Sequence, residues 1–404
     1  MKKTLSLLLA LVMLFGLFAG CGKEPAVPKQ PSASTGDTTT QTPEMPAAPE
    51  TPEVSETPAE PEPEPEPVRE AVTLAMTEAQ DKVKTYGRSF YTEEGLRCDW
   101  AASGIEFTVD CEGDIKANYD ATIPGYFQIY VDGEATSRPE IKEKKDVVLT
   151  VAEGLPAGEH TIRMVREHDI DTAGGVFLLK SLEYTGFADT LRPAEDKDLY
   201  IEFIGDSITS GLGCLDGRQY TTRFDSVHSA THAYSYLTAQ ALDADWSMVS
   251  RGGIGIFKGT TVGNKTVFDM YPSYNCWYPN APEYTFERKA DIVVMALATN
   301  DHSSVNTGAE FRAGFKQLMD LIREKHGQDV QIVCVWGMMT TTWGNQLTIA
   351  AEECGVHCIR VTQNNNGGSY KAGGTGHPHA DGHAIVAQEL TTYIQEKVLP
   401  QLKK

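Results

Sequence analysis

Residues 201–211 decide the fold, and their sequence reads Ile-Glu-Phe-Ile-Gly-Asp-Ser-Ile-Thr-Ser-Gly. The apolar residues predict a buried strand, and the Gly-Asp-Ser that follows predicts a turn with a helix starting directly behind Ser207. A serine placed there has its hydroxyl at the open end of a sheet, beside the free N–H groups of a helix. It can serve as an acyl-transfer nucleophile if partner residues follow in order; without them the stretch is only a strand that ends in a turn.

The chain after residue 196 alternates between strand and helix patterns. Buried-strand patterns lie at residues 199–204, 292–297 and 332–335. Helical patterns lie at residues 233–242, 308–323, 346–354 and 383–398. This alternation predicts an α/β domain, a parallel sheet with helices on both faces in three layers. In such sheets the ligand site lies outside the carboxyl ends of the strands.

The preceding region, about residues 70–190, has an all-β pattern. Short alternating runs lie at residues 105–111, 127–131, 147–151, 160–165 and 176–184, with turn residues at 156–158. This spacing predicts a β-sandwich of jelly-roll type. Such a domain could bind sugar or simply support its neighbour.

The N-terminus predicts a targeting signal. Lys2 and Lys3 precede an apolar run at residues 5–19, which is shorter than the roughly 20 residues of a membrane-spanning helix. Small residues directly before Cys21 resemble a bacterial lipobox, which implies cleavage before Cys21 and lipidation of it; the alternative is an ordinary secretory signal. The Pro, Glu and Thr residues that follow predict a disordered tether. We therefore expect a signal peptide at residues 1–20, a linker at 21–68, the β-sandwich domain at 69–192 and the α/β domain at 193–404, on the bacterial cell surface.

The net charge and the cysteine content limit the binding partners and the disulfide bonds that we expect. The 404 residues carry a formal net charge of -21, which argues against nucleic acid or anionic membrane as the main partner. We expect contact with the membrane only through the lipid anchor, a monomer, and no cofactor or metal. Of the 8 Cys, an odd number remains if Cys21 is lipidated; Cys98 and Cys111 could form a bridge, and Cys334 lies in a core pattern.

Three further motifs fall near predicted strand ends or in loops. Asn300, in a Thr-Asn-Asp sequence, could donate its amide to an oxyanion, a contribution worth roughly 3 kcal/mol, or could form an Asx turn. Gly253 could bring a backbone N–H close to a substrate oxygen. His377, in a Gly-rich loop before the last helix, could be the base that a serine nucleophile needs. His379 and His383 compete for this role and raise a metal site, for which no ligand pattern is present; we expect His383 to help start the last helix.

The order of these motifs resembles the SGNH or GDSL hydrolase superfamily over residues 196–404. With the β-domain before it, the chain resembles the second carbohydrate esterase family, whose members include acetyl xylan esterases. Tyr-Gly-Arg at 86–88, Gly-Glu-His-Thr at 158–161 and Val-Trp-Gly-Met-Met at 335–339 fit this comparison. The resemblance implies hydrolysis of O-acetyl groups on polysaccharides such as xylan or glucomannan. It implies Ser207 as nucleophile, His377 as base, and Ser207 N–H, Gly253 and Asn300 as oxyanion donors.

The substrate surface and the triad acid are less clearly marked. Trp336 and Trp277 are candidates for stacking on a sugar, and Asp301 is a candidate for substrate binding. The superfamily pattern Gly-x-Asn-Asp begins here with Ala298, and the expected triad Asp falls at Gly374. We therefore predict a Ser–His dyad in which a backbone carbonyl orients His377, with Asp381 or Asp301 as substitutes. The alternatives are a non-catalytic glycan-binding lipoprotein and an esterase acting on peptidoglycan acetyl groups or lipids.

Overall fold

The computed structural model describes residues 67–168, 175–215, 224–257, 263–278, 280–301, 305–363 and 376–402. Residues 65–404 belong to one compact unit. The predicted signal peptide, Cys21 and nearly all of the predicted linker lie outside the described residues, as does Gly374. Across the ranges described, no helix has the length and apolar character needed to cross a membrane.

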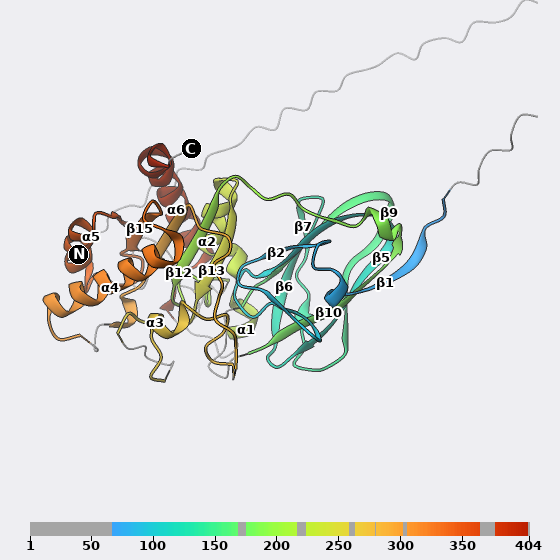
Figure 1. Ribbon diagram of the computed structural model, residues 1–404, viewed down its shortest axis with the longest axis horizontal. Coiled ribbons are helices and arrows are strands. Elements are labelled where there is room, and N and C mark those ends of the chain that lie inside the picture. Colours follow the sequence, from blue (N-terminus) through green and yellow to red (C-terminus); the bar gives the residue numbers. More distant parts are fainter. Residues whose placement is uncertain are drawn as a thin grey trace, which may run out of the picture. The chain divides into compact units, whose positions relative to one another are not determined.

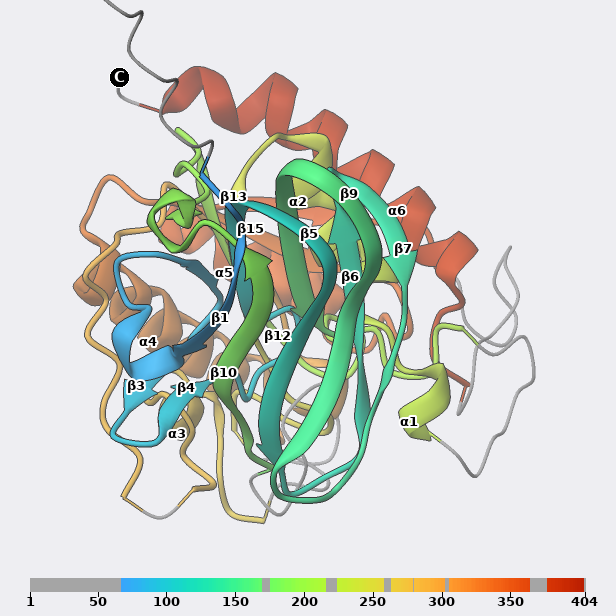
Figure 2. The same ribbon diagram turned by 90° about the vertical axis from the view of Figure 1, so that its right-hand side faces the viewer.

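Antiparallel strands form the first part of this unit (Figure 1). Within the described residues they make one eleven-stranded sheet in which the path runs β3-β4-β10-β5-β9-β6-β7, with β1, β2, β8 and β11 attached to it. The long strands β5, β9 and β10 curl side by side around a common core (Figure 2). The strands are β1 Glu70–Ala75, β2 Lys84–Tyr86, β3 Phe90–Thr92, β4 Gly95–Arg97, β5 Gly104–Ala121, β6 Gly125–Val131, β7 Glu134–Ser137, β8 Glu140–Ile141, β9 Val147–Arg166, β10 Phe177–Gly186 and β11 Arg192–Pro193.

The predicted turn at residues 156–158 is wrong, because these residues lie inside the continuous strand β9. Leu155 pairs with Gly113 of β5 and Gly158 pairs with Cys111, so two residues of β9 oppose one residue of β5 between these pairs. Such a bulge accommodates a proline without ending the strand. The predicted Cys98–Cys111 bridge is also absent, since both are free, buried thiols.

A five-stranded parallel sheet follows, with the order β13-β12-β14-β15-β16. Its strands are β12 Tyr200–Gly205, β13 Asp245–Ser250, β14 Ile292–Ala296, β15 Gln331–Trp336 and β16 His357–Arg360. The helices are α1 Phe224–Val227, α2 Tyr234–Ala241, α3 Val267–Met270, α4 Gly308–His326, α5 Gly344–Cys354 and α6 Ala380–Tyr393. The sequence did not predict β13, which has buried polar residues, or β16, which is a half-buried edge strand.

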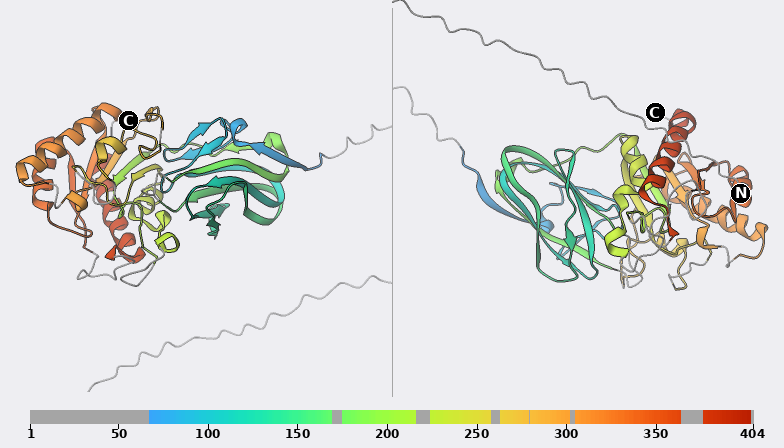
Figure 3. Two further views of the ribbon diagram at one scale, coloured as in Figure 1. Left: turned by 90° about the horizontal axis from the view of Figure 1, so that it is seen from below. Right: turned by 180° about the vertical axis from the view of Figure 1, so that it is seen from behind.

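Alternate residues of the sheet pack on opposite helical layers. Val293 and Met295 share a core with α4 and α5, whereas Ile292 and Val294 share a core with α2 and α6. This alternation follows from the two-residue period of a strand and explains why both strand faces are apolar. Figure 3 shows the helices on either side of the parallel strands. The predicted α/β arrangement of a parallel sheet between helices is confirmed.

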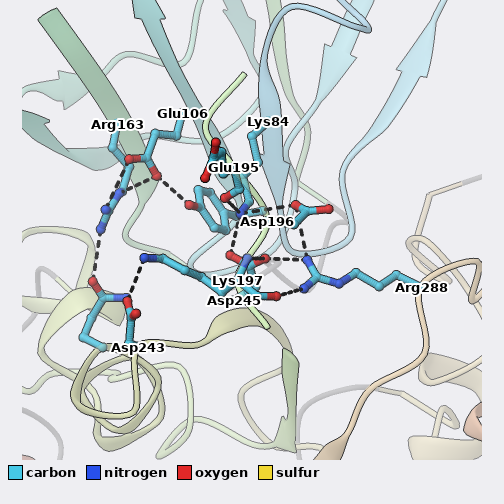
Figure 4. A network of polar contacts seen from close by, with 11 residues as sticks. Lys84, Glu106, Arg163, Glu195, Asp196, Lys197, Asp243, Asp245 and Arg288 are labelled. Atoms are coloured by element: carbon cyan, nitrogen blue, oxygen red, sulfur yellow. Dashed lines mark hydrogen bonds and ion pairs between the residues drawn. The ribbon is translucent and has the colours of Figure 1, made fainter. Parts of the chain in front are cut away.

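Buried charges join the antiparallel strands to the parallel sheet (Figure 4). Lys84 of β2 donates to Asp245 Oδ1, the first residue of β13, at 2.6 Å, and Arg288 pairs with the other oxygen of the same carboxylate. The side chains of Lys84 and Asp245 are 5% and 3% exposed. Because both charges are removed from water, each depends on the other to remain in the interior.

A second buried pair reaches the middle of β12. Arg88, between β2 and β3, donates to Glu202 Oε2 at 3.2 Å, and both side chains are fully buried. Ala290 N–H donates to His326 Nδ1, so the ring proton is on Nε2, which lies 2.7 Å from Tyr271 Oη and 3.1 Å from Glu202 Oε1. Burial opposes the charge of Glu202, but Arg88 and the hydrogen bond from His326 outweigh it and lower its pKa to about 2. Glu202 is therefore ionised in the folded protein.

Replacing Glu202 with Gln should lower the free energy of unfolding by about 3–5 kcal/mol, because Arg88 then keeps its charge in the interior with the carbonyls of Tyr271 and Ser273 as partners but no opposite charge. The folded-state pKa of Glu202 lies below its unfolded value, so its contribution is complete above the ordinary carboxyl range and is lost as the pH falls toward 2. Urea unfolding at pH 7 and at pH 3 should thus show a smaller difference between wild type and variant at pH 3. Asp320→Asn, in the exposed Lys316–Asp320 pair, is the control and should change stability little; equal losses in the two variants would contradict the prediction.

Candidate active site

Ser207 lies two residues after the end of β12, in a series of turns. Leu212 N–H donates to Ser207 O at 2.9 Å, but the predicted helix behind Ser207 is wrong. Gly211 and Gly213 have φ values of 77° and 69°, a left-handed conformation that interrupts a right-handed helix. At Gly205 a Cβ atom would come within 1.9 Å of Thr209 Oγ1, so glycine is required for the chain to turn this tightly.

His377 is the side chain that the structure places on Ser207. His377 Nε2 lies 2.7 Å from Ser207 Oγ, although 170 residues separate them in the chain. When Nε2 accepts the hydroxyl proton, the ring proton of the neutral imidazole is on Nδ1. This is the geometry in which an imidazole can remove a proton from a serine.

The other two histidines of this segment have structural positions. His379 is the N-cap of α6, and its side chain accepts from Asp381 N–H. His383, predicted to start the helix, instead lies within it, where Nδ1 accepts from Tyr234 N–H at 3.1 Å. Burial lowers the pKa of His383 to about 3, so its ring is neutral. Over the described ranges, no three His, Cys, Asp or Glu side chains are grouped to hold a metal ion.

Asn300 follows β14 and reaches back to the turn that holds Ser207. Its Nδ2 donates to Asp206 Oδ2 at 3.1 Å and to the carbonyl of Ile254 at 2.9 Å. Asp206 is fully buried and its other oxygen accepts from Ile208 N–H. Burial, with the nearby charge of Asp301, raises the pKa of Asp206 to about 7 against the effect of that hydrogen bond. The sequence placed Asp206 only in the Gly-Asp-Ser turn, and its hydrogen bond with the Asn300 amide was missed.

Gly253 lies in the turn after β13. Ile254 N–H donates to Arg251 O at 3.1 Å and Gly253 has a φ of 81°, as the third residue of a type II turn requires. The structure therefore supplies the tight glycine turn that the sequence predicted at the same edge of the sheet as Ser207.

Asp301 has a position that differs from the prediction. It is fully buried, and its carboxylate accepts from Ile256 N–H at 3.0 Å and Phe257 N–H at 2.9 Å. A Cβ at Gly255 would come within 2.5 Å of Asp301 Oδ1, which explains the glycine there. Asp301 therefore holds the loop after β13, and we correct its predicted role in substrate binding to a structural one.

The two predicted tryptophans lie in different surroundings. Trp336 ends β15, and the guanidinium of Arg360 lies over its ring at 5.2 Å. Arg251 lies over the ring of Trp277 at 5.5 Å. Trp336 also lines a small cavity with Ile208 and Thr299, the neighbours in sequence of Ser207 and Asn300, whereas Trp277 does not line it.

Comparison with known proteins identifies relatives of the whole folded unit. Residues 85–186 match the family model described as Carbohydrate esterase 2 N-terminal. The chain is 26% identical over 332 residues to a cellulase/esterase of Acetivibrio thermocellus, and 29% identical over 188 residues to an acetylxylan esterase/glucomannan deacetylase of Cellvibrio japonicus. These matches cover 76% and 44% of this chain, but only 38% and 49% of the lengths of those two relatives.

Solved structures share the fold. A family two carbohydrate esterase from Clostridium thermocellum, in complex with cellohexaose, has a TM-score of 0.71 at 22% identity, covering 79% of this chain and 100% of that chain. An acetyl xylan esterase from the rumen bacterium Butyrivibrio proteoclasticus has a TM-score of 0.72 at 20% identity, covering 83% of this chain and 100% of that one. The resemblance to carbohydrate esterase family two predicted from the motifs is therefore confirmed.

Ala298 offers a test of backbone strain beside the site. Its φ of 90° is unusual for a residue with a side chain. Ala298→Gly should raise the free energy of unfolding by about 0.5–1 kcal/mol, because the gain at positive φ exceeds the entropic cost of glycine. Ala296→Gly, in the regular strand β14, should lower it by a similar amount. Thermal unfolding of both variants checks the prediction, and a shift of the same sign in both would contradict it.

Proposed function

We propose that this protein is a serine esterase that removes O-acetyl groups from xylan- or glucomannan-type polysaccharides. The observation that carries the proposal is the 2.7 Å contact between His377 Nε2 and Ser207 Oγ at the carboxyl edge of the parallel sheet. The named activities of similar proteins, acetylxylan esterase and glucomannan deacetylase, support the substrate class.

In the proposed mechanism, His377 Nε2 takes the proton of the Ser207 hydroxyl as Ser207 Oγ attacks the acetyl carbonyl. The sugar alcohol then leaves with that proton, and water activated by His377 hydrolyses the acetyl-enzyme. The backbone N–H groups of Ser207 and Gly253 and the amide of Asn300 stabilise the oxyanion. In the structure the Asn300 amide donates to Asp206 and to Ile254 O. In the reaction the oxyanion replaces Ile254 O as acceptor, while the hydrogen bond to Asp206 keeps the side chain in place.

We further propose that Ser207 and His377 act as a dyad. Asp381 faces His379, with 3.5 Å between its oxygen and Nδ1, and its side chain is 74% exposed. Asp301 holds the amides of Ile256 and Phe257. Both predicted substitutes for a triad acid thus have other partners, which favours a backbone carbonyl as the group that orients His377.

The location and the role of the β-domain are also proposals. The sequence before residue 67 favours a lipid-anchored protein held outside the cytoplasm by a Pro-Glu tether. We interpret the curled antiparallel sheet as a jelly roll that supports the hydrolase domain, because its buried cations Lys84 and Arg88 neutralise carboxylates of the parallel sheet.

Hydrolysis of 4-nitrophenyl acetate should fall by at least about 10³-fold in Ser207→Ala and in His377→Ala, since either change removes the nucleophile or its base. Acetate release from acetylated xylan, glucomannan and peptidoglycan by the wild type then identifies the polymer. Equal rates for wild type and Ser207→Ala would refute the serine mechanism. Glycan binding without any hydrolysis would favour the alternative of a non-catalytic surface lipoprotein.

Asp381→Asn tests the dyad. An acid that orients the imidazole costs about 10⁴-fold in kcat when it is replaced by the amide. The surface position of Asp381 predicts instead that kcat on 4-nitrophenyl acetate changes by less than a factor of about three. A loss of several orders of magnitude would make Asp381 the third member of a triad.

A further inference from the structure

A cavity lined by the chain neighbours of Ser207 and Asn300 is much smaller than a sugar. It lies over the ends of β14 and β15 and is lined by Ile208, Ala298, Thr299, Trp336 and Leu347, among others. Its volume is about 30 Å³. On this scale one water molecule needs about 10–15 Å³, and a cavity that binds benzene has roughly 150 Å³. A pyranose ring cannot enter it, but a methyl group can.

The position of the cavity relates it to the reacting carbonyl. Ile208 directly follows Ser207, and Thr299 directly precedes Asn300. The cavity wall therefore includes a chain neighbour of the residue that would carry the acyl group, Ser207, and a chain neighbour of the residue that would bind its carbonyl oxygen, Asn300. The lining is largely apolar, which suits an alkyl end and not the hydroxyl groups of a sugar.

Three apolar side chains of the lining are fixed in place by the core. Ile208, Leu347 and Met338 are 5%, 2% and 4% exposed. Trp343 stacks on Phe311 with ring centroids 4.9 Å apart and planes at 7°. Walls packed in this way cannot move aside for a longer acyl chain without loss of core contacts.

Trp336 is held as a wall of the same cavity. A Cβ at Gly344 would lie 2.0 Å from its Cζ3, so the ring packs closely on the start of α5. Arg360 lies over the ring, where a sugar would have to stack. These contacts favour a role for Trp336 in shaping the cavity over the sugar stacking predicted from the sequence.

We propose that this cavity receives the acyl group of the substrate, and that Leu347 and Trp336 limit that group to acetyl. The proposal rests on the esterase function proposed above and adds the residues that select the acyl chain. It also makes the sugar bind outside this cavity, so that one part of the site recognises the acyl group and another recognises the polysaccharide.

The test compares kcat/KM for 4-nitrophenyl acetate, propionate and butyrate in one preparation of each protein, so that the ratio does not depend on the fraction that is folded. One methylene more or less in an apolar pocket changes the ratio of kcat/KM between two substrates by about 10–200-fold. The wild type should therefore prefer acetate to propionate by at least about tenfold, and Leu347→Ala should raise the butyrate-to-acetate ratio by about tenfold or more. Ile349→Ala, on the same helix but with an exposed side chain, is the matched control and should leave the ratio unchanged.

Trp336→Leu separates the acyl wall from a sugar platform. It should raise the butyrate-to-acetate ratio while leaving the ratio of acetylxylan to 4-nitrophenyl acetate activity unchanged. A fall in the acetylxylan ratio with no change in acyl preference would overturn the proposal and make Trp336 a sugar-binding residue. An unchanged acyl preference in Leu347→Ala would also overturn it. If hydrolysis does not depend on Ser207, the proposed function is wrong. If hydrolysis depends on Ser207 but the acyl ratios do not change in the variants, only the inference about the cavity is wrong.

Discussion

The ion pair between Arg88 and Glu202 is the interaction on which the arrangement of this protein depends. Glu202 lies on β12, the strand that also delivers Ser207, and Arg88 comes from the antiparallel part of the chain. Two fully buried charges are tolerated only when they are paired, so the position of β12 in the sheet is tied to the antiparallel strands. Ser207, the proposed nucleophile, therefore follows a strand whose position is set by charge as well as by apolar packing.

From that strand the site is assembled by loops at one edge of the sheet. Ser207 follows β12, Gly253 follows β13 and Asn300 follows β14, while His377 precedes α6. Asp206 connects two of these positions, because it accepts from both Ile208 N–H and the Asn300 amide. The loop after β13 has its own support in Asp301. Asn300 and the loop after β13 are thus each held by a buried carboxylate.

The sequence was sufficient for the layers and for the pairing of Ser207 with His377, because parallel strands bring their carboxyl ends to one edge however far apart they are in the chain. It was insufficient where the outcome depends on backbone conformation. The expected helix after Ser207 is interrupted by left-handed glycines, and the expected turn at residues 156–158 is absorbed as a bulge against β5. It was also insufficient for Asp301, since a carboxylate after an asparagine can face either substrate or loop amides, and only the fold decides between them.

The split of buried charges between the two sheets has a consequence for how this protein can be divided. Lys84 and Arg88 lie on the antiparallel side, while their partners Asp245 and Glu202 lie on the parallel side. A fragment that contains only one side would keep either Arg88 or Glu202 without its opposite charge and would expose the stacked Tyr86 and Trp246, whose ring centroids are 3.9 Å apart. The two halves are therefore not interchangeable modules: recombination with unrelated partners must move them together, as a single inherited unit.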